Sequence, residues 1–185
     1  MHKMQEIKDR SEQRIIQRDG LLSLADCLRK EGKKIVTTNG SFDLLHAGHL
    51  QLLKEAKEQG DVLIVGLNSD ASVKQYKSKD RPIIPQEYRA EMLAAIRYVD
   101  YVVIMDEPEI AVPLVTMVKP DVHVNGSEYG ENCVEAEAVK KNGGRLHIVK
   151  LKGGLSTTEI VGRICRAYSG KEEYYPQGKE SINER

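Results

Sequence analysis

Short apolar runs alternate along the chain with stretches in which apolar residues recur every three or four positions. The runs are rich in Val, Ile and Leu, as strands covered on both faces of a sheet should be. They predict five strands, over residues 35–38, 62–67, 101–105, 122–124 and 146–151. Because segments with helical spacing lie between them, the chain reads as repeated β-α-β units.

The segments between the strands carry the predicted helices. One short helix capped by Ser23 precedes the first strand. The others are expected from His49 to Gly60, over 86–98, over 109–118, over 131–142 and from Ser156 onward. The apolar stripe over 86–98 includes Tyr88. The fold class that follows is α/β, a single Rossmann-like, doubly wound sheet of five parallel strands with helices on both faces.

A length of 185 residues suits one domain with a sizeable core. Residues 1–20 are charged and weakly periodic, which predicts an N-terminal extension. Residues 170–185 have no apolar stripe and are predicted to be a flexible C-terminal tail. The folded domain is expected to span residues 21–169.

Composition narrows the function classes. Lys plus Arg is 28 and Asp plus Glu is 28, so the basic excess typical of a nucleic-acid binder is missing. No apolar run approaches the ~20 residues of a membrane span, and the polar first residues lead us to expect no signal peptide. Cys27, Cys133 and Cys165 are scattered and odd in number, which favours a reducing, cytoplasmic location over a disulfide framework and suggests no metal site.

The most informative segment runs from Thr38 to His49, directly after the first predicted strand. His46 and His49 are three residues apart, so on an entering helix both imidazoles lie on one face. Two surface histidines would show the same spacing. Here, however, Asn39 and Gly40 form a tight turn that lets a phosphate approach the backbone, and a helix start adds oriented N–H groups. The segment therefore predicts an anion site, most plausibly for a triphosphate.

Two neighbours of this turn are also candidates. Phe42, the only Phe in the chain, is expected to pack below the turn and fix it. Asp43 has three open interpretations: it orients a histidine, holds an ion or caps the turn.

A second motif begins at Gly153-Gly154 and continues with three hydroxyl residues, Ser156, Thr157 and Thr158. An ordinary helix N-cap completed by Glu159 would account for one hydroxyl. Three hydroxyls at a helix start favour a further phosphate contact.

The third segment, Lys74 to Pro82, is basic and follows the carboxyl end of the second strand. A solvated charged loop is the common outcome for such a run. It can also fold over the crevice expected at the carboxyl ends of the strands, beside the histidine turn. One lysine there would neutralise β- and γ-phosphate charge, and Lys77 is preferred for that role.

Three further positions complete the candidates. Arg97 either forms a salt bridge at a helix end or reaches the nucleotide. Residues 125–129 follow the fourth strand and should line the crevice, although simple loop packing is the alternative. His123 and His147 lie inside strands and are expected to be structural.

Thr38 to His49 and Gly154 to Thr158 resemble the two signature segments of the cytidylyltransferase-like nucleotidyltransferase superfamily, which carries a His-x-Gly-His motif. The resemblance covers about residues 20–168. It implies five parallel strands in the order 3-2-1-4-5 and a frequent dimer. It also implies direct nucleotidyl transfer, in which a substrate phosphate attacks the α-phosphate of a nucleoside triphosphate and pyrophosphate leaves.

Two subfamilies look closest, the heptose 1-phosphate adenylyltransferases and the glycerol-3-phosphate cytidylyltransferases. Residues 32–36, 68–73, 81–83 and 142–144 resemble the heptose enzymes, and the Arg usual before the cytidylyltransferase Ser-Thr-Thr is missing. The pattern departs from the heptose enzymes at Ser41, where Cys is common, and at Asn125, where Lys is common.

The resemblance therefore implies transfer of AMP from ATP to a heptose 1-phosphate by a cytoplasmic homodimer, without nucleic acid or membrane partners. The alternatives are CTP-dependent transfer to a polyol phosphate and a nucleotide-binding regulator without catalysis. Mg²⁺ would be carried mainly by the ATP phosphates, with no protein metal site. The implied catalytic residues are His46, His49 and Lys77. The implied nucleotide-binding residues are Asn39, Gly40, Ser41, Phe42, Gly48, Arg97, Gly126, Ser156, Thr157 and Thr158. The implied substrate-binding residues are Asp43, Asn125 and Glu128.

Overall fold

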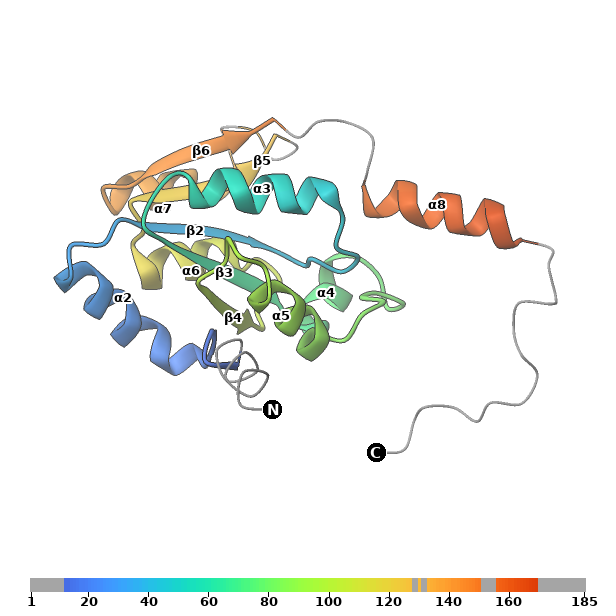
Figure 1. Cartoon of the computed structure of the whole chain (residues 1–185), viewed down its shortest axis with the longest axis horizontal. Helices are drawn as coiled ribbons and strands as arrows, with labels where there is room; N and C mark the ends of the chain where they lie inside the picture. Colours follow the sequence, from blue (N-terminus) through green and yellow to red (C-terminus); the bar gives the residue numbers. More distant parts are fainter. Residues whose placement is uncertain (1–11, 128–129, 131–132, 151–155, 170–185) are drawn as a thin grey trace.

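A computed structural model describes residues 12–127, 130, 133–150 and 156–169. Six strands, all parallel, form one sheet in the order β1-β4-β3-β2-β5-β6 (Figure 1). They are β1 (Ile15–Ile16), β2 (Ile35–Gly40), β3 (Val62–Asn68), β4 (Tyr101–Met105), β5 (Val122–Gly126) and β6 (Arg145–Val149).

The prediction of a parallel, doubly wound α/β sheet is confirmed, with one strand more than the five expected. Without β1, the strand order is the 3-2-1-4-5 that the family resemblance implies. The extra strand β1 is an edge strand of two residues within the segment expected to be an extension, and Ile15 pairs with Val102. Two residues carry no periodicity, so the pattern could not predict it.

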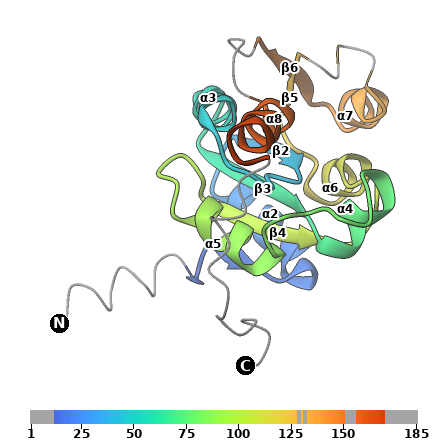
Figure 2. The ribbon, with the colours of Figure 1, turned by 90° about the vertical axis from the view of Figure 1, so that its right-hand side faces the viewer.

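Helices follow most strands and cover both faces of the sheet (Figures 1 and 2). The short 3-10 helix η1 (Arg18–Gly20) precedes them. The α-helices are α2 (Leu21–Lys30), α3 (Ala47–Lys57), α4 (Asp70–Tyr76), α5 (Gln86–Ala94), α6 (Ala111–Val118), α7 (Ala136–Lys141) and α8 (Thr157–Tyr168).

Two apolar cores hold these layers together. On one face, α3 and α5 pack against the sheet through residues such as Leu53 and Leu93, both fully buried. On the other face, α2 and α6 contribute Leu21 and Leu114, also fully buried. Gly60, which ends the α3 segment, is required for close packing, because a Cβ there would lie 2.7 Å from the Lys34 carbonyl oxygen. The sheet is therefore buried on both faces, as its apolar strands predict.

Three local predictions are wrong. The first helix begins at Leu21, after Gly20, so Ser23 is not its cap. The segment expected to be a basic loop is helical over its first three residues, Lys74–Tyr76, which end α4. The cap of that helix, Ser69, accepts a hydrogen bond from the Ser72 amide. On α5, Tyr88 is 60% exposed and Arg89 is buried in its place.

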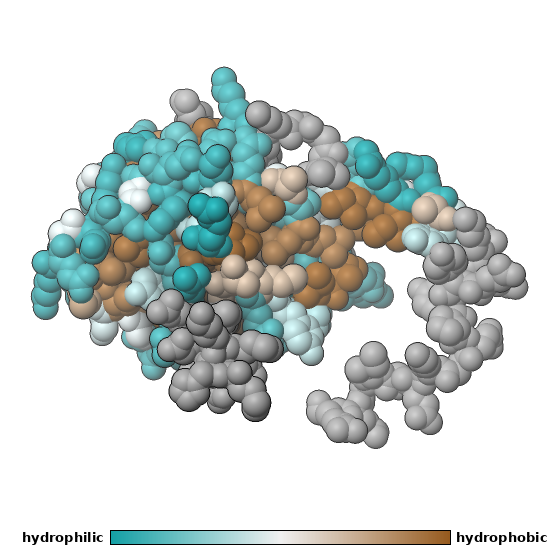
Figure 3. All heavy atoms as spheres, in the orientation of Figure 1, coloured by the Kyte–Doolittle hydropathy of each residue, from teal (hydrophilic) through white to brown (hydrophobic). Residues whose placement is uncertain are grey.

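Helix α8 differs from the others because none of its residues is buried. It lies beyond the carboxyl ends of the strands, to the right in Figure 1 and toward the viewer in Figure 2. Its apolar residues form a brown patch in Figure 3, and Ile164 is 49% exposed. None of the helices that the structure describes has the length and apolar character needed to cross a membrane.

Candidate active site

The candidate site begins where β2 ends, at the carboxyl edge of the sheet. Beyond Gly40 the chain turns at Phe42, whose φ of 43° lies in the left-handed region. The Phe42 ring is 2% exposed and lies under the turn, since a Cβ on Gly40 would come within 3.3 Å of it. This anchored turn delivers His46 to the N-cap of α3, so that His49 falls in its first turn.

The two imidazoles stack on each other. The ring centroids of His46 and His49 are 3.7 Å apart at an interplanar angle of 24°, and the His49 ring lies 5.2 Å from the Phe42 ring. The Nδ1 atoms of both histidines are buried and have no hydrogen-bond partner among the described residues. The pair is therefore held by ring packing and not by hydrogen bonds to Nδ1.

Both histidines are neutral near pH 7. Burial lowers the pKa of His46. The pKa of His49 is lowered to about 4, first by burial and then by the nearby charges of His46 and Lys77. A neutral imidazole still offers one N–H donor, and an approaching phosphate would favour protonation and raise both pKa values.

Lys77 reaches the same turn from the end of α4. Its ammonium group donates a hydrogen bond of 2.8 Å to the Ser41 hydroxyl. Burial, followed by the positive charge of Arg81, lowers the pKa of Lys77, and the Asp43 carboxylate opposes this effect. The structure thus brings together Lys77 and the two histidines, which lie 28 and 31 positions before it in the sequence.

Asp43 ties a second loop to this turn. Its carboxylate is fully buried and accepts hydrogen bonds from the Arg81 Nε (2.5 Å) and from the amides of Ile83 (2.8 Å) and Ile84 (3.0 Å). Of the interpretations open for Asp43, turn stabilisation is the one this geometry matches, although the loop it holds is distant in sequence.

Arg89 is the functional neighbour that the sequence reasoning missed. Its side chain is 0% exposed and donates to the carbonyl oxygens of Ser41 (2.5 Å), Asn68 (2.9 Å) and Ile84 (2.8 Å). It also pairs with the Asp70 carboxylate at 2.6 Å. One cation therefore fixes the ends of β2 and β3, the start of α4 and the loop before α5. The sequence contained one signal for this burial: Arg89 precedes Leu93 by four residues, so on a helix the two lie on the same, buried face.

A separate polar cluster lies behind the end of β5. His123 is 2.8 Å from the Thr37 hydroxyl and 3.5 Å from Glu135, so it is structural, as its place in a strand predicts. The Asn125 amide donates to Glu135. Burial alone would raise the pKa of Glu135, but hydrogen bonds from His123 and Asn125 outweigh it and lower that pKa to about 2. Asn125 is thus held by an ionised carboxylate, beside the candidate Gly126.

Some predicted site residues are not brought to the histidines. Arg97 lies after α5, near the amino-terminal edge of the sheet, with its guanidinium 5.2 Å from the Tyr98 ring. Ser156 caps α8 by accepting a hydrogen bond from the Glu159 amide (3.1 Å), and Thr157 and Thr158 begin that helix, which has no buried residue. Glu128 and Gly153-Gly154 lie outside the described residues.

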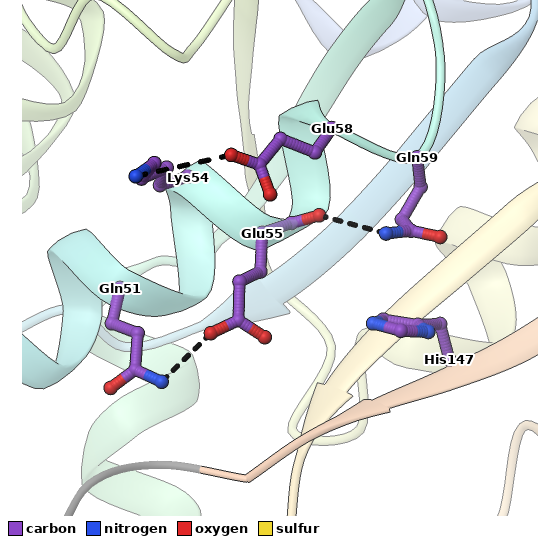
Figure 4. Close-up of a pocket in the computed structure, with 6 residues that line it drawn as sticks. All are labelled: Gln51, Lys54, Glu55, Glu58, Gln59 and His147. Atoms are coloured by element: carbon purple, nitrogen blue, oxygen red, sulfur yellow. Dashed lines mark hydrogen bonds and ion pairs between the residues drawn. The ribbon is translucent and has the colours of Figure 1, made fainter.

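Two hollows flank α3 and the carboxyl edge. A polar groove of about 610 Å³ runs between α3 and β6, but its side chains pair with one another, as in the 2.8 Å bond from Gln51 to Glu55 (Figure 4). A smaller cavity of about 240 Å³ lies at the ends of β2 and β3, and its lining includes the candidates Asn39 and Gly40. Only the second adjoins the turn that carries the histidines.

A parallel sheet that carries a glycine-containing turn and paired histidines at its carboxyl edge is typical of Rossmann-like nucleotidyltransferases. The chain belongs to the cytidylyltransferase-like family, whose model matches residues 37–163. The family predicted from the two motifs is confirmed.

Relatives and solved structures agree with this membership. The chain is 46% identical over 159 residues to the bifunctional protein HldE of Geobacter metallireducens, covering 85% of this chain and 32% of that protein. It is 30% identical, with a TM-score of 0.53, to the crystal structure of a lipopolysaccharide core biosynthesis protein from Thermoplasma volcanium, covering 67% of this chain and 100% of that one.

A third comparison supports the fold alone. The pantoate-beta-alanine ligase of Francisella tularensis, solved with a β-γ ATP ligand and β-alanine, has a TM-score of 0.59 at 18% identity, covering 82% of this chain and 77% of that one. The chain spans about a third of the length of the curated relatives it matches.

Proposed function

We propose that the protein transfers AMP from ATP to a heptose 1-phosphate, giving ADP-heptose and pyrophosphate. The observation that carries this proposal is the stacked, neutral histidine pair at the start of α3, with the Lys77 ammonium held beside it by Ser41. The similarity to HldE proteins and to a lipopolysaccharide core biosynthesis protein supports a sugar phosphate as the acceptor.

In the proposed step, an oxygen of the sugar phosphate attacks the α-phosphorus of ATP. The bond from that phosphorus to the bridging oxygen breaks, and its electron pair leaves with pyrophosphate. No protein nucleophile is needed, so the protein supplies positioning and charge stabilisation. His46 and His49 donate hydrogen bonds to the α-phosphate and bridging oxygens, and Lys77 neutralises charge that develops on the β and γ side.

The remaining residues are assigned to binding. Asn39, Gly40, Ser41, Phe42 and Gly48 form or support the turn that receives the nucleotide. We also assign to it the more distant Arg97, Gly126, Ser156, Thr157 and Thr158. Asn125 and Glu128 are assigned to the acceptor. Asp43 is assigned to the acceptor side through the loop that it positions, since Arg81 and the two backbone amides already bond to its carboxylate.

Mg²⁺ fits this site as an ion brought by the ATP phosphates. Among the described residues, no cluster of three His, Cys, Asp or Glu side chains is arranged to hold a metal ion. When bound, Mg²⁺ would neutralise phosphate charge, and it commonly keeps few protein ligands. The chain's own contribution is then the histidine pair and Lys77.

We further propose a cytoplasmic homodimer whose nucleotidyltransferase domain spans residues 21–169. Exposed apolar residues on α8, such as Ile164 at 49%, support an interface between copies. Sedimentation at several concentrations tests the dimer, and a monomer at all of them would remove it. Scattered cysteines favour a reducing compartment. Cell fractionation tests the location, and recovery outside the cytoplasm would contradict it.

The test of the proposed activity is pyrophosphate release measured with ATP, CTP, GTP and UTP against a panel of sugar and polyol phosphates. ATP with D-glycero-β-D-manno-heptose 1-phosphate should be the fastest pair. Preference for CTP with glycerol 3-phosphate would instead support the cytidylyltransferase alternative. Release with no pair would support a regulator that binds nucleotide without catalysis.

A further inference from the structure

The cavity at the ends of β2 and β3 lies beside the turn that carries the histidines but has a different chemical character. Asn39, Asn68, Tyr76, Glu109 and Ile110 are among the residues that line its volume of about 240 Å³. Pockets that enclose drug-sized ligands are commonly ~300 Å³ or more. This cavity therefore suits a compact polar group better than a whole nucleotide.

The cavity is rich in hydrogen-bond acceptors. The Oδ1 atom of Asn39 is buried and has no hydrogen-bond partner among the described residues. The Oδ1 of Asn68 accepts only a long bond of 3.4 Å from the Tyr76 hydroxyl. Glu109 adds a carboxylate, and its nearby charge contributes to raising the pKa of Tyr76 behind the larger effect of burial. A ligand here should bring several donors.

The orientation of Asn68 is fixed by its neighbours. Its side-chain nitrogen donates to the Ser72 hydroxyl at 2.8 Å, and that hydroxyl donates in turn to the Glu107 carbonyl oxygen at 2.6 Å. Because Ser72 uses its proton on Glu107, it can only accept from Asn68. The carbonyl end of the Asn68 amide is therefore the end directed to Tyr76.

Two groups of opposite charge, Lys77 and Glu109, lie near Tyr76 at this cavity. The Lys77 ammonium lies 5.6 Å from the Tyr76 ring centroid and bonds to Ser41 on the histidine side. Glu109 is itself one of the residues that line the cavity, just before the start of α6. A phosphate is attracted by Lys77 and repelled by Glu109, whereas hydroxyl groups can donate to Glu109, Asn39 and Asn68.

We propose that this cavity binds the polyhydroxyl body of the phosphorylated acceptor, with Tyr76, Asn68 and Glu109 as specificity-determining residues, Asn39 shared with the nucleotide turn, and the acceptor phosphate directed toward the histidine pair. The proposal rests on the proposed function, because it identifies the acceptor side of that site. The Tyr76 ring also gives an apolar face on which the C–H groups of a sugar ring can pack.

The experiment measures two affinities by calorimetry. The first is the affinity for Mg²⁺-ATP, and the second is that for D-glycero-β-D-manno-heptose 1-phosphate with a non-hydrolysable ATP analogue present. Tyr76→Phe and Glu109→Gln each remove hydrogen-bonding capacity with little change of shape. Each should weaken heptose phosphate binding by about fivefold, the loss of one ordinary hydrogen bond of about 1 kcal/mol. ATP binding should change by less than about twofold. Tyr88→Phe, on the exposed side of α5, is the matched control.

The outcomes separate the cavity from the reaction. If wild-type protein makes ADP-heptose but neither variant alters heptose phosphate affinity, the cavity assignment is overturned and the reaction stands. If both variants weaken ATP and leave the acceptor unchanged, the cavity belongs to the nucleotide and the assignment is again overturned. If no nucleotide sugar forms but the variants still weaken heptose phosphate binding, the cavity is supported and the proposed activity fails.

Discussion

The smallest unit of the site is a pair of imidazoles that the fold keeps neutral. Because the ring centroids of the two histidines are only 3.7 Å apart, a positive charge on one ring disfavours protonation of the other. In the proposed reaction, the phosphates of ATP bring negative charge beside both rings. The same side chains that are neutral in the free protein can therefore become strong donors once the triphosphate arrives.

This state of the histidines gives a pH prediction. The pKa of His49 is about 4 in the folded chain and about 6.5 when unfolded, so between these values the unfolded state binds more protons. The free energy of unfolding should therefore fall as pH falls from about 6.5 to about 4. NMR titration of the His49 ring should give the low pKa in the free protein and a higher one with Mg²⁺-ATP. A free-protein pKa at or above 6.5 would contradict it.

Lys77 gives the second residue-scale prediction. Because its contact is proposed to matter most in the transition state, Lys77→Ala should lower kcat by about tenfold or more, with ATP affinity within about threefold of wild type. Steady-state kinetics and ATP titration measure the two effects. Lys74→Ala and Lys79→Ala are the controls and should be nearly neutral. Equal small effects from all three variants would remove Lys77 from the site.

At the scale of the elements, Arg89 connects segments that would otherwise be independent. Its guanidinium bonds to the ends of β2 and β3 and to the loop before α5, while Asp43 holds that loop from the other side. Helix α4, whose C-cap is Lys77, and the turn that carries the histidines are thus fixed relative to each other before any ligand binds. This reduces the entropy that binding must remove.

The element-scale prediction follows from this burial. Arg89→Leu leaves the Asp70 carboxylate and three carbonyl oxygens without their donor, so unfolding free energy should fall by about 3–5 kcal/mol. Urea unfolding measures this loss. The control is Arg97→Leu, which removes an exposed cation–π contact and should cost about 1 kcal/mol or less. A cost for Arg89→Leu no larger than that of the control would refute the role of Arg89.

Most of the regular elements, with the exceptions of β1 and α4, could be predicted from sequence because they depend on local periodicity. The strand predicted over residues 101–105 is β4 with the same bounds, and the others agree within a few residues. Arg89 and Asp43 were not accessible in the same way, because their bonds join segments about 40 positions apart. No local sequence pattern predicts that a buried arginine will donate to four oxygen atoms from distant segments.

On the scale of the whole molecule, parallel strands bring distant segments to one edge of the sheet. The histidine turn follows β2, Lys77 follows β3 through α4, and the acceptor cavity reaches the loop after β4. The two motifs that identified the family mark only part of this edge. The second of them leads into α8, which stands beyond the sheet with no buried residue (Figure 1).

The central claim is that the histidine pair drives nucleotidyl transfer, and the most direct test is turnover of ATP with heptose 1-phosphate by His46→Ala and His49→Ala. Each variant should release pyrophosphate about 10²-fold more slowly than wild type, the usual effect of removing one transition-state donor. Both side chains lie on the rim of the core, so melting temperatures should remain close to that of the wild type. Turnover within about threefold of wild type, on folded protein, would contradict the account.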